Sequence, residues 1–529
     1  MRCEHGVVRV LSAADAALLL ETADLDEAVR MLPALVDAAL PGVTELVPAA
    51  RTILVRFDPT LVPGDRLAAR LLEIEPVAAR ASSDRAVSIP VRYDGQDLAE
   101  VAQHLGVSTE EVVARHQRAS WTVAFSGFAP GFGYLLGDDP LFDVPRRPSP
   151  RTRIPAGSVG LAGRFSGVYP KESPGGWQLI GRTDAVLWDL ERDPPALLAP
   201  GTTVRFERAE RDLVAAPAAP TRAPVTSAHA VEVARPGLQL LVQDLGRPGL
   251  AAHGVSASGA ADRSSLREAN RAVGNEPRLA GLELAGGGAV LRFRGPAVIA
   301  LAGALADAAI ASSVPGGREG HPVEPQRPVA LDDGDELRIG RVRDGLRVII
   351  AIRGGIALDP VLGSLATDTL GGIGPAPLAA GDGLPLHGPA AGTAAVERTR
   401  APRIALPTPG QTVELGIMLG PRNEWFAEDA LWVLVEQEWE VTPRSDRVGV
   451  RLAGERPLVR AREGELESEG AVTGAIQVPP DGQPVLFLPD HPPTGGYPVI
   501  GAVVDRDLDL AGQLPPGARI RFRVSAPGR

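Results

Sequence analysis

The chain has 529 residues, of which 44% are hydrophobic and 22% are charged, and its net charge is -11 at pH 7. This length exceeds what one hydrophobic core usually supports, so about three or four domains are expected. The 60 glycines and 50 prolines favour turn-rich β structure over helix bundles. The acidic balance disfavours a nucleic-acid partner or an anionic membrane, although a local basic pocket can still hold a small anion.

Cys3 is the only cysteine, so neither an intrachain disulfide nor a thiolate metal site can form, and a reducing compartment is favoured. Residues 11–20 lack a basic segment followed by a long apolar one, and no stretch reaches the roughly 18 apolar residues of a membrane span. We therefore expect a cytoplasmic protein with no membrane partner.

Residues 1–83 alternate strand and helix patterns, which predicts a small α+β domain. The apolar segment 7–13 indicates a strand, and 43–57 indicates a hairpin of two strands. Amphipathic patterns predict one helix over 24–40, interrupted near Pro33, and a second over 63–75.

Residues 84–208 open with a strand at 87–93 and two short helices at 97–105 and 108–116. Ser108 and Glu111 form a capping-box pattern at the second helix. A DNA-binding helix-turn-helix is disfavoured because that helix carries Glu110 and Glu111. We interpret the helices as a lid or buttress. From Trp121 onward, short strands separated by glycine and proline are typical of a β-barrel.

The stretch 125–177 is the strongest candidate for a site, because its aromatic residues alternate with glycine and proline instead of following a core period. Tight glycine turns let another molecule approach the backbone closely. The predicted substrate-binding residues here are Phe128, Pro130, Gly131, Ser173, Pro174, Gly175, Gly176 and Trp177. The alternative is a set of barrel turns packed by Phe128, Phe132, Tyr134 and Trp177.

Lys171 is the only lysine in the chain. A GxxxxGK[ST] phosphate loop and a biotin carrier each need a lysine in a specific motif, and neither motif is present. The histidines are scattered singly, so a zinc site is not expected and we assign no metal ligand.

The blocks GFAPGF, PRTRIPAGSVGLAG and SPGGWQLIGRT resemble the B subunit of the bacterial ATP-dependent 5-oxoprolinases, also described as allophanate hydrolase subunit 1 or as an inhibitor of a sporulation kinase. The resemblance covers residues 5 to 208, here called the B half. Gly133 stands where the family usually has proline, and residues 164–166 also depart from its pattern.

Residues 209–229 are rich in alanine and proline with no apolar period, which predicts a semi-rigid linker. We call the rest of the chain, residues 230–529, the C half. Its sequence predicts a strand, a turn and a helix up to Ala272, then a hairpin over 282–293 and further short strands. The predicted divisions are 1–83, 84–208, the linker 209–229, 230–390 and 391–529.

The C half resembles the C subunit of the same enzymes, or allophanate hydrolase subunit 2, and also the carboxyltransferase region of urea carboxylase. The residues that carry this resemblance include QDLGRPG, SDRVGVRLAG and TGGYPVIGAVV. An internal repeat supports related folds, since Pro174-Gly-Gly-Trp and a later Pro-Gly strand recur as Thr494-Gly-Gly-Tyr and Pro516-Gly. The resemblance implies a mainly β fold with an α+β N-terminal part and cyclophilin-like barrels, one in the B half and two in the C half.

No self-sufficient catalytic constellation is visible, so the candidates are polar groups on glycine turns. Arginine captures carboxylates bidentately, and a neighbouring carboxylate can act as a base. The predicted catalytic residues are Asp244, Arg247 and Asp262. The predicted substrate-binding residues of the C half are Gln243, Ser445, Asp446, Arg447, Gln477, Asp481, Gln483, Thr494, Gly495, Gly496 and Tyr497. Pro492 and Pro493 replace polar residues common in the family, which lowers the ligand-binding potential there.

Three hypotheses follow from the resemblance. The first is a fused B/C component of an ATP-dependent 5-oxoprolinase, inactive alone, which opens 5-oxoproline to glutamate with a separate A subunit; ATP acts through that complex. The second is the carboxyltransferase component of a urea amidolyase, with biotin on a separate carrier. The third is a non-enzymatic regulator that binds a histidine kinase. Homo-oligomer formation stays open.

Overall fold

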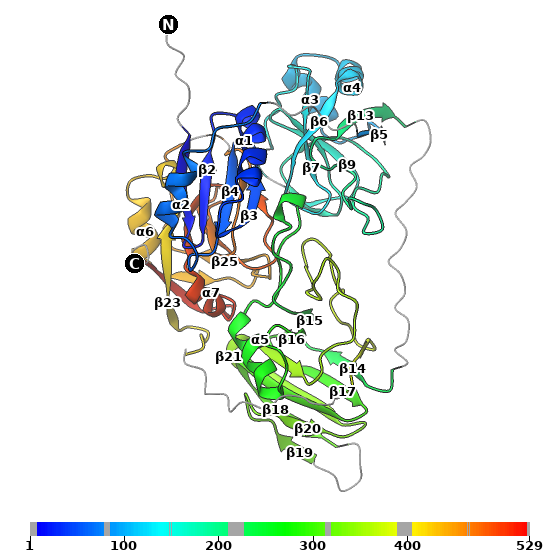
Figure 1. Ribbon diagram of the computed structural model, residues 1–529, viewed down its shortest axis with the longest axis vertical. Helices are drawn as coiled ribbons and strands as arrows, with labels where there is room; N and C mark the ends of the chain where they lie inside the picture. Colours follow the sequence, from blue (N-terminus) through cyan, green and yellow to red (C-terminus); the bar gives the residue numbers. More distant parts are fainter. Residues whose placement is uncertain are drawn as a thin grey trace.

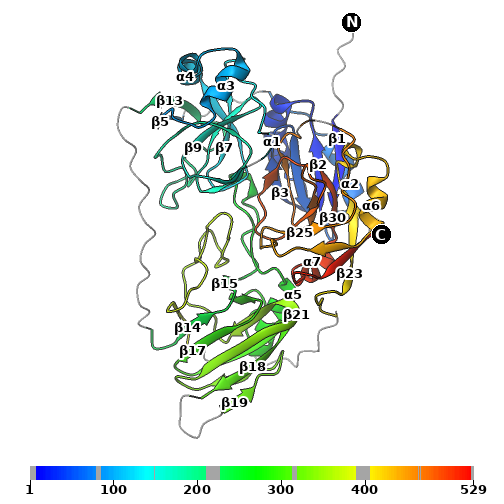
Figure 2. The same ribbon diagram turned by 180° about the vertical axis from the view of Figure 1, so that it is seen from behind.

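The computed structural model describes residues 8–78, 85–147, 149, 151–209, 227–312, 319–388, 405–462, 464 and 466–525. Most of the linker predicted at 209–229 lies outside these residues. Figures 1 and 2 show the N-terminal sheet lying against the C-terminal barrel, a second barrel beside them, and a large sheet at the opposite end. Within the described residues, no helix combines the length and hydropathy that a bilayer crossing requires.

The N-terminal sheet has four antiparallel strands in the order β1-β2-β4-β3 and two helices. Their bounds are β1 (Arg9–Ala14), β2 (Ala17–Glu21), α1 (Leu25–Ala38), β3 (Val43–Pro48), β4 (Thr52–Phe57) and α2 (Gly64–Leu71). The sequence analysis missed β2. The predicted interruption at Pro33 was wrong, because α1 runs through it. Met31 and Leu35 on the helix are buried in the core under the sheet, which offsets the hydrogen bond that proline cannot make.

Side chains alternate between the two faces of this sheet, so each face has its own core. Ile53 and Val55 pack in the cluster that includes α1 and α2. Leu19 and Leu54 point the other way and pack with residues of the C-terminal barrel, including Phe487. The N-terminal sheet of the B half is therefore a layer between its own helices and the end of the C half.

The B-half barrel contains β5 (Ala86–Val91), α3 (Leu98–Leu105), α4 (Thr109–Arg118), β6 (Trp121–Ser126), β7 (Gly133–Gly137), β8 (Arg151–Ile154), β9 (Ser158–Ala162), β10 (Phe165–Val168), β11 (Ser173–Gly175), β12 (Gln178–Arg182) and β13 (Thr203–Arg208). Seven strands follow the order β12-β9-β10-β7-β6-β13-β5, and β8 pairs with β11. The bridge between Arg92 and Arg182 brings the two edges together and nearly closes the barrel. Ser108 caps α4 as predicted, by accepting from the Glu111 amide.

The large sheet contains β14 (Ala230–Pro236), β15 (Gln239–Gln243), β16 (Gly281–Ala285), β17 (Ala289–Arg294), β18 (Ala297–Ala311), β19 (Glu319–Pro322), β20 (Val329–Leu331), β21 (Glu336–Ile352) and β22 (Gly383–Pro385), with the short helix η1 (Ala251–His253) and α5 (Arg263–Val273). The hairpin predicted over 282–293 was wrong. Strands β16 and β17 each pair with β21, which lies between them. The three glycines 286–288 all have positive φ and carry the chain across β21.

The C-terminal barrel is closed in the order β23-β30-β27-β28-β25-β24-β31. Its elements are β23 (Thr412–Leu419), η2 (Asn423–Trp425), α6 (Ala430–Glu436), β24 (Trp439–Val441), β25 (Gly449–Ala453), β26 (Glu469–Gly470), β27 (Ala475–Gln477), β28 (Val485–Phe487), β29 (Thr494–Gly495), β30 (Val499–Val503), α7 (Asp505–Ala511) and β31 (Arg519–Val524). The predicted fold class, mainly β with barrels after an α+β N-terminal part, is confirmed by this arrangement. Of the two barrels predicted in the C half, the one over 391–529 is closed, whereas the described strands between 230 and 385 form the nine-stranded sheet.

The two seven-stranded barrels share details that the internal repeat predicted only in outline. In each barrel the last strand pairs in parallel with the first, β13 with β5 and β31 with β23. In each, a buried tryptophan opens a strand after a helix and donates its indole N–H to a carbonyl five residues earlier: Trp121 to His116, and Trp439 to Leu434. The division of the chain into the predicted domain ranges stays a prediction.

Candidate functional site at the junction of the two halves

The glycine-rich turn 127–131 of the B half docks directly on the C half. The Phe128 amide donates to Thr494 Oγ1 at 3.0 Å, although the two residues are 366 positions apart. A β-carbon at Gly127 would collide with the same threonine, and one at Gly254 would collide with the Ala129 carbonyl. Phe128 adopts φ 63, a left-handed conformation that costs energy in a non-glycine residue. Gly127 of the B half and Gly254 of the C half therefore permit the close approach of the two halves.

A segment of the C half, residues 366–374, meets the same turn. A β-carbon at Gly371 would lie 3.2 Å from Pro130 Cγ and would collide with the Asp368 carboxylate. From the B half, Lys171 Nζ donates to the Leu370 carbonyl at 3.4 Å. We call the region formed by residues 127–131, 243–262, 366–374 and 490–494 the loop junction.

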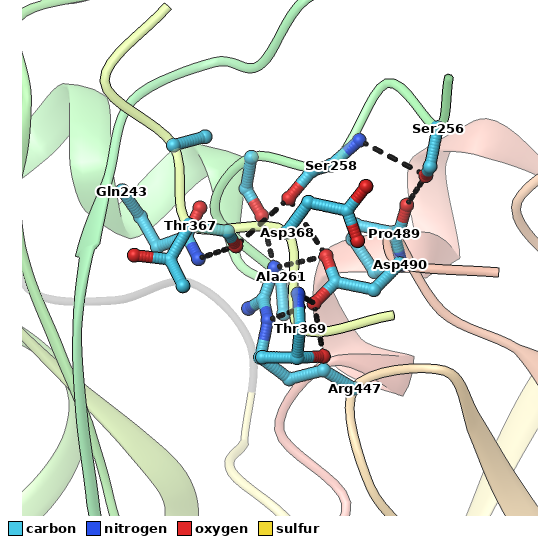
Figure 3. Close-up of polar contacts among 12 residues, drawn as sticks. Gln243, Ser256, Ser258, Ala261, Thr367, Asp368, Thr369, Arg447, Pro489 and Asp490 are labelled. Carbon is cyan, nitrogen blue, oxygen red and sulfur yellow. Dashed lines mark hydrogen bonds and ion pairs between the residues drawn. The ribbon is translucent and has the colours of Figure 1, made fainter. Parts of the chain in front are cut away.

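A buried ion pair holds the loop junction together (Figure 3). Arg447 is 1% exposed, and its Nε and Nη2 each donate to an Asp490 carboxylate oxygen at 3.0 Å. The same carboxylate accepts from Ser258 Oγ at 2.7 Å, from the Thr369 amide at 3.0 Å and from Thr369 Oγ1 at 2.6 Å. Asp490 thereby ties the large sheet's loops to the C-terminal barrel.

The charges of this pair reinforce each other. Burial alone would raise the pKa of Asp490, but the Arg447 guanidinium and the hydrogen bonds of Thr369 hold that pKa below its usual value. Burial would lower the pKa of Arg447, but Asp490 and Glu283 raise it. Both groups stay ionised, as a structural pair needs.

Three buried polar atoms near residues 366–368 have no hydrogen-bond partner: Gln243 Oε1, Arg247 Nη1 and Asp368 Oδ2. Gln243 Nε2 donates to the Thr367 carbonyl at 2.8 Å, and Arg247 Nη2 donates to the Ala366 carbonyl. Asp368 Oδ1 accepts from the amides of Leu370 and Gly371 at 3.0 and 2.7 Å. An unpartnered buried polar atom costs roughly 1–3 kcal/mol, so a group that supplies partners here gains that energy.

Asp368 is also a titratable group of the loop junction. Its burial, followed by the nearby Asp490 charge, raises its pKa to about 6. Burial lowers the pKa of Arg247, and the carboxylates of Asp368 and Asp244 oppose that effect. Asp368 can therefore take up or release a proton close to neutral pH.

The three predicted catalytic residues have different surroundings. Asp244 accepts from the Gly246 amide at 2.7 Å, Ser364 Oγ at 2.6 Å and the Leu365 amide at 2.7 Å, so it caps turns. Asp262 caps α5 through Ser265 and accepts from Gln513 Nε2 at 2.7 Å, and its burial raises its pKa. Of the three, Arg247 alone keeps an unpartnered atom. Their catalytic roles stay predictions.

The predicted substrate-binding residues divide into two groups. The loop junction brings together Phe128, Pro130, Gly131, Gln243, Arg447 and Thr494. The second group accepts hydrogen bonds from backbone amides in turns of the C-terminal barrel. Ser445 accepts from Arg451, and Asp446 accepts from Val448 and Gly449. Gln483 accepts from Gly454, and Asp481 accepts from Gln483.

The remaining predicted residues lie around the two Gly-Gly turns. Gly176 accepts from the Arg147 amide, and the Trp177 side chain is 6% exposed and meets Phe132 edge-on at 5.3 Å. Gln477 Nε2 donates to the Tyr497 carbonyl at 3.2 Å beside Gly495, and Arg460 lies over the Tyr497 ring at 5.7 Å. A β-carbon at Gly496 would collide with Arg146. Ser173, Pro174 and Gly175 form β11, and Ser173 Oγ donates to the Lys171 carbonyl at 3.3 Å.

The sequence analysis missed Asp368, Thr369 and Ser258 as site residues and gave Lys171 no role. The signal in the sequence was the run Thr367-Asp-Thr-Leu-Gly-Gly, where hydrogen-bonding side chains precede two adjacent glycines. Pro492 and Pro493 follow His491, whose ring stacks on Phe487 at 5.4 Å. Burial lowers the pKa of His491 to about 4, so it is neutral at pH 7 and packs as an aromatic residue.

One cavity lies beside the loop junction and another lies in the B-half barrel away from it. One of about 170 Å³ lies directly against the 257–261 loop, between the β1–β2 turn and the C-terminal barrel, with Arg56 and Arg263 among its lining residues. The other, of about 360 Å³, lies between α3 and Pro145 and Gln178 of the B-half barrel. Within the described ranges, no three His, Cys, Asp or Glu side chains are grouped to hold a metal ion.

Comparison with known families gives the class of the protein. The description "Carboxyltransferase domain, subdomain C and D" matches residues 8–198, and "Carboxyltransferase domain, subdomain A and B" matches residues 253–524. The chain belongs to this carboxyltransferase domain family and carries both parts in one polypeptide.

Individual relatives match one half each. The B half is 42% identical over 181 residues to the 5-oxoprolinase B subunit of Escherichia coli O157:H7, covering 34% of this chain and 82% of that protein. The C half is 32% identical over 298 residues to the 5-oxoprolinase C subunit of Escherichia coli strain K12, covering 55% of this chain and 90% of that protein. Urea amidolyase of Lachancea kluyveri is 33% identical over 314 residues, 55% of this chain but only 17% of its own length.

One solved structure is similar over almost the whole chain. The crystal structure of TTHA0988 has a TM-score of 0.81 and 37% identity, covering 96% of this chain and 99% of that one. The Kluyveromyces lactis urea amidolyase structure has a TM-score of 0.50 and 31% identity over 55% of this chain and 18% of that chain.

Proposed function

We propose that this protein is the fused B/C component of an ATP-dependent 5-oxoprolinase, which opens the lactam of 5-oxoproline to glutamate together with a separate A subunit. The observation that carries the proposal is that one chain matches a 5-oxoprolinase B subunit over 82% and a 5-oxoprolinase C subunit over 90% of their lengths. The loop junction, where both halves contribute residues, supports a single shared site.

In this reaction, the proposed tasks of this chain are to bind the amide and to transfer a proton. One water adds across the lactam C–N bond to give a carboxylate and an amine. A second water is consumed as ATP is cleaved to ADP and phosphate, and this cleavage is coupled to ring opening through the A subunit. A lactam offers a carbonyl oxygen as acceptor and an N–H as donor. Arg247 Nη1 is an unpartnered donor, whereas Gln243 Oε1 and Asp368 Oδ2 are unpartnered oxygens.

A lactam placed between these atoms would give Arg247 Nη1 and Gln243 Oε1 their missing partners. We assign Arg247 to the carbonyl oxygen, where charge accumulates as water adds, and Gln243 to the lactam N–H. Asp368 is the proton carrier, because a pKa of about 6 lets it change protonation during turnover. Segment 366–374 must move to admit the ligand, since all three atoms are buried, and three of its residues are glycines.

The test is reconstitution. The chain is purified alone and together with a 5-oxoprolinase A subunit from the same organism, and 5-oxoproline-dependent formation of ADP and glutamate is measured. We expect turnover only from the complex. Urea with a biotin carrier forms the control arm, and urea-dependent ATP cleavage without 5-oxoproline turnover would contradict the proposal. Binding to a histidine kinase with neither activity would replace it with a regulatory role.

A further inference from the structure

The single lysine occupies an unusual place in an arginine-rich chain. Of the 54 lysine and arginine residues, Lys171 is the only lysine. The two side chains differ physically, because lysine carries a compact ammonium group with three donors, whereas the guanidinium of arginine is planar and larger. At position 171 the chain therefore carries a compact cation where its other basic positions carry arginine.

The structure gives a steric reason for this choice. Lys171 lies between β10 and β11 of the B half, and its Nζ reaches the Leu370 carbonyl of the C half at 3.4 Å. A β-carbon at Gly372 would collide with Nζ, so the ammonium fills the space beside a glycine whose φ is +66°. A guanidinium cannot take the same position without displacing the 366–374 segment.

The ammonium group of Lys171, at the edge of the loop junction, can donate further hydrogen bonds. Among the described residues, Nζ donates to the Leu370 carbonyl, which leaves two of its three N–H groups for other partners. The side chain is exposed, so a small molecule can reach it. Leu370 follows Asp368 by two residues, and Gly371 lies next to both the Asp368 carboxylate and Pro130.

We propose that Lys171 binds the carboxylate of the small amide substrate at the mouth of the loop junction, so that the B half supplies the anion-binding group and the C half supplies the groups that contact the amide. This inference rests on the proposed function for the identity of the substrate. It explains why a cation of the B half bonds to the segment of the C half that carries the unpartnered Asp368 oxygen. A hydrogen bond between charged groups changes affinity by roughly ten- to hundredfold.

The single lysine makes a direct test simple. The purified chain is treated with an amine-acetylating reagent, and the labelling rate of the peptide that contains Lys171 is measured by mass spectrometry, with the α-amino group of the chain as internal reference. The probes are 5-oxoproline, glutarate, 2-pyrrolidinone, which is the same lactam without a carboxylate, and inorganic phosphate. We expect 5-oxoproline and glutarate to slow labelling at least fivefold, and 2-pyrrolidinone to leave it unchanged.

The outcomes separate this inference from the proposed function. Protection by glutarate without 5-oxoproline turnover by the complex would support the carboxylate site and contradict the proposed function. Equal labelling with every probe would overturn the inference, and so would protection by phosphate alone, which would identify a phosphoryl site. In an active complex, we expect Lys171→Met and Lys171→Arg to raise the KM for 5-oxoproline at least tenfold with kcat changed less than twofold. Arg341→Met removes the same charge from an exposed position on β21 and should leave KM unchanged.

Discussion

Replacing Asp368 by asparagine tests the energetic role assigned to the loop junction. Asparagine keeps an oxygen that can accept from the Leu370 and Gly371 amides, so the turn retains its cap. The substitution replaces the ionisable Oδ2, which has no hydrogen-bond partner to lose, with an uncharged NH2 group. Any change in stability therefore reports the cost of burying the charge.

The magnitude follows from the pKa of Asp368, which rises from 3.8 in an unfolded chain to about 6 in the fold. The folded state then binds more protons than the unfolded state between these values, so its stability falls as pH rises through that window and stays low above it. At about 1.4 kcal/mol per pKa unit, burying the Asp368 carboxyl group lowers the free energy of unfolding by ~1.5 kcal/mol at pH 5 and by ~3 kcal/mol at pH 8. We expect Asp368→Asn to recover these amounts, and hence to be more stabilising at pH 8.

The assay is native-state hydrogen exchange of the peptide spanning 364–374, which gives the local free energy of opening at each pH after correction for intrinsic exchange rates. In the reconstituted complex, the same variant should lose at least tenfold in kcat, about 1.4 kcal/mol of transition-state stabilisation. A variant that is destabilised equally at pH 5 and pH 8 would show that the carboxylate is a structural cap and that the charge-burial argument is wrong.

Two further predictions concern the contacts between the halves, and a third concerns the aromatic core of the B half. Arg422→Met should lower the free energy of unfolding by roughly 3–5 kcal/mol in urea titrations, because it leaves Glu469 buried without its partner, whereas Glu21 keeps Arg9 and Arg51; a change below about 1 kcal/mol would contradict this. Chains cut at residue 220 should remain associated during gel filtration, since Leu54 and Phe487 share one core; separate elution would mean that only the linker joins the halves. For Trp177→Ala, the ligand-wall hypothesis predicts at least tenfold lower activity of the complex at unchanged melting temperature, whereas loss of the aromatic packing predicts a parallel loss of stability.

Local sequence patterns were enough to predict the mainly β fold class and the helices α1 to α5. The Ser108 cap and α5 came from signals within a few residues. The predictions that were wrong concern elements whose structure depends on residues far away in the sequence. β16 and β17 were predicted as a hairpin because they are adjacent in sequence, yet β21 separates them, and nothing local encodes which strand enters between two others. Likewise, α1 continues through Pro33 because the sheet holds its apolar face, a tertiary effect that overrides local propensity.

The candidate site was predicted in part for the same reason. Glycine turns and arginines are visible in the sequence, and Gln243, Arg247 and Phe128 do meet at the loop junction. The sequence could not show that both carboxylate oxygens of Asp244 accept hydrogen bonds from a turn, because the donors at 364 and 365 are about 120 positions away in the chain. Asp368 was missed because its significance lies in an oxygen that the packing around it leaves without a partner.

The contacts between the halves differ in how freely they can adjust, and this difference bears on catalysis. The N-terminal sheet shares an apolar core with the C-terminal barrel, and the buried Arg422, Glu21 and Glu469 add bonds with fixed geometry. Segment 366–374, in contrast, meets the B half through Pro130 and one long hydrogen bond from Lys171. If segment 366–374 moves to admit a ligand, as we propose, the rigid interface keeps the two halves together and the B-half turn in place.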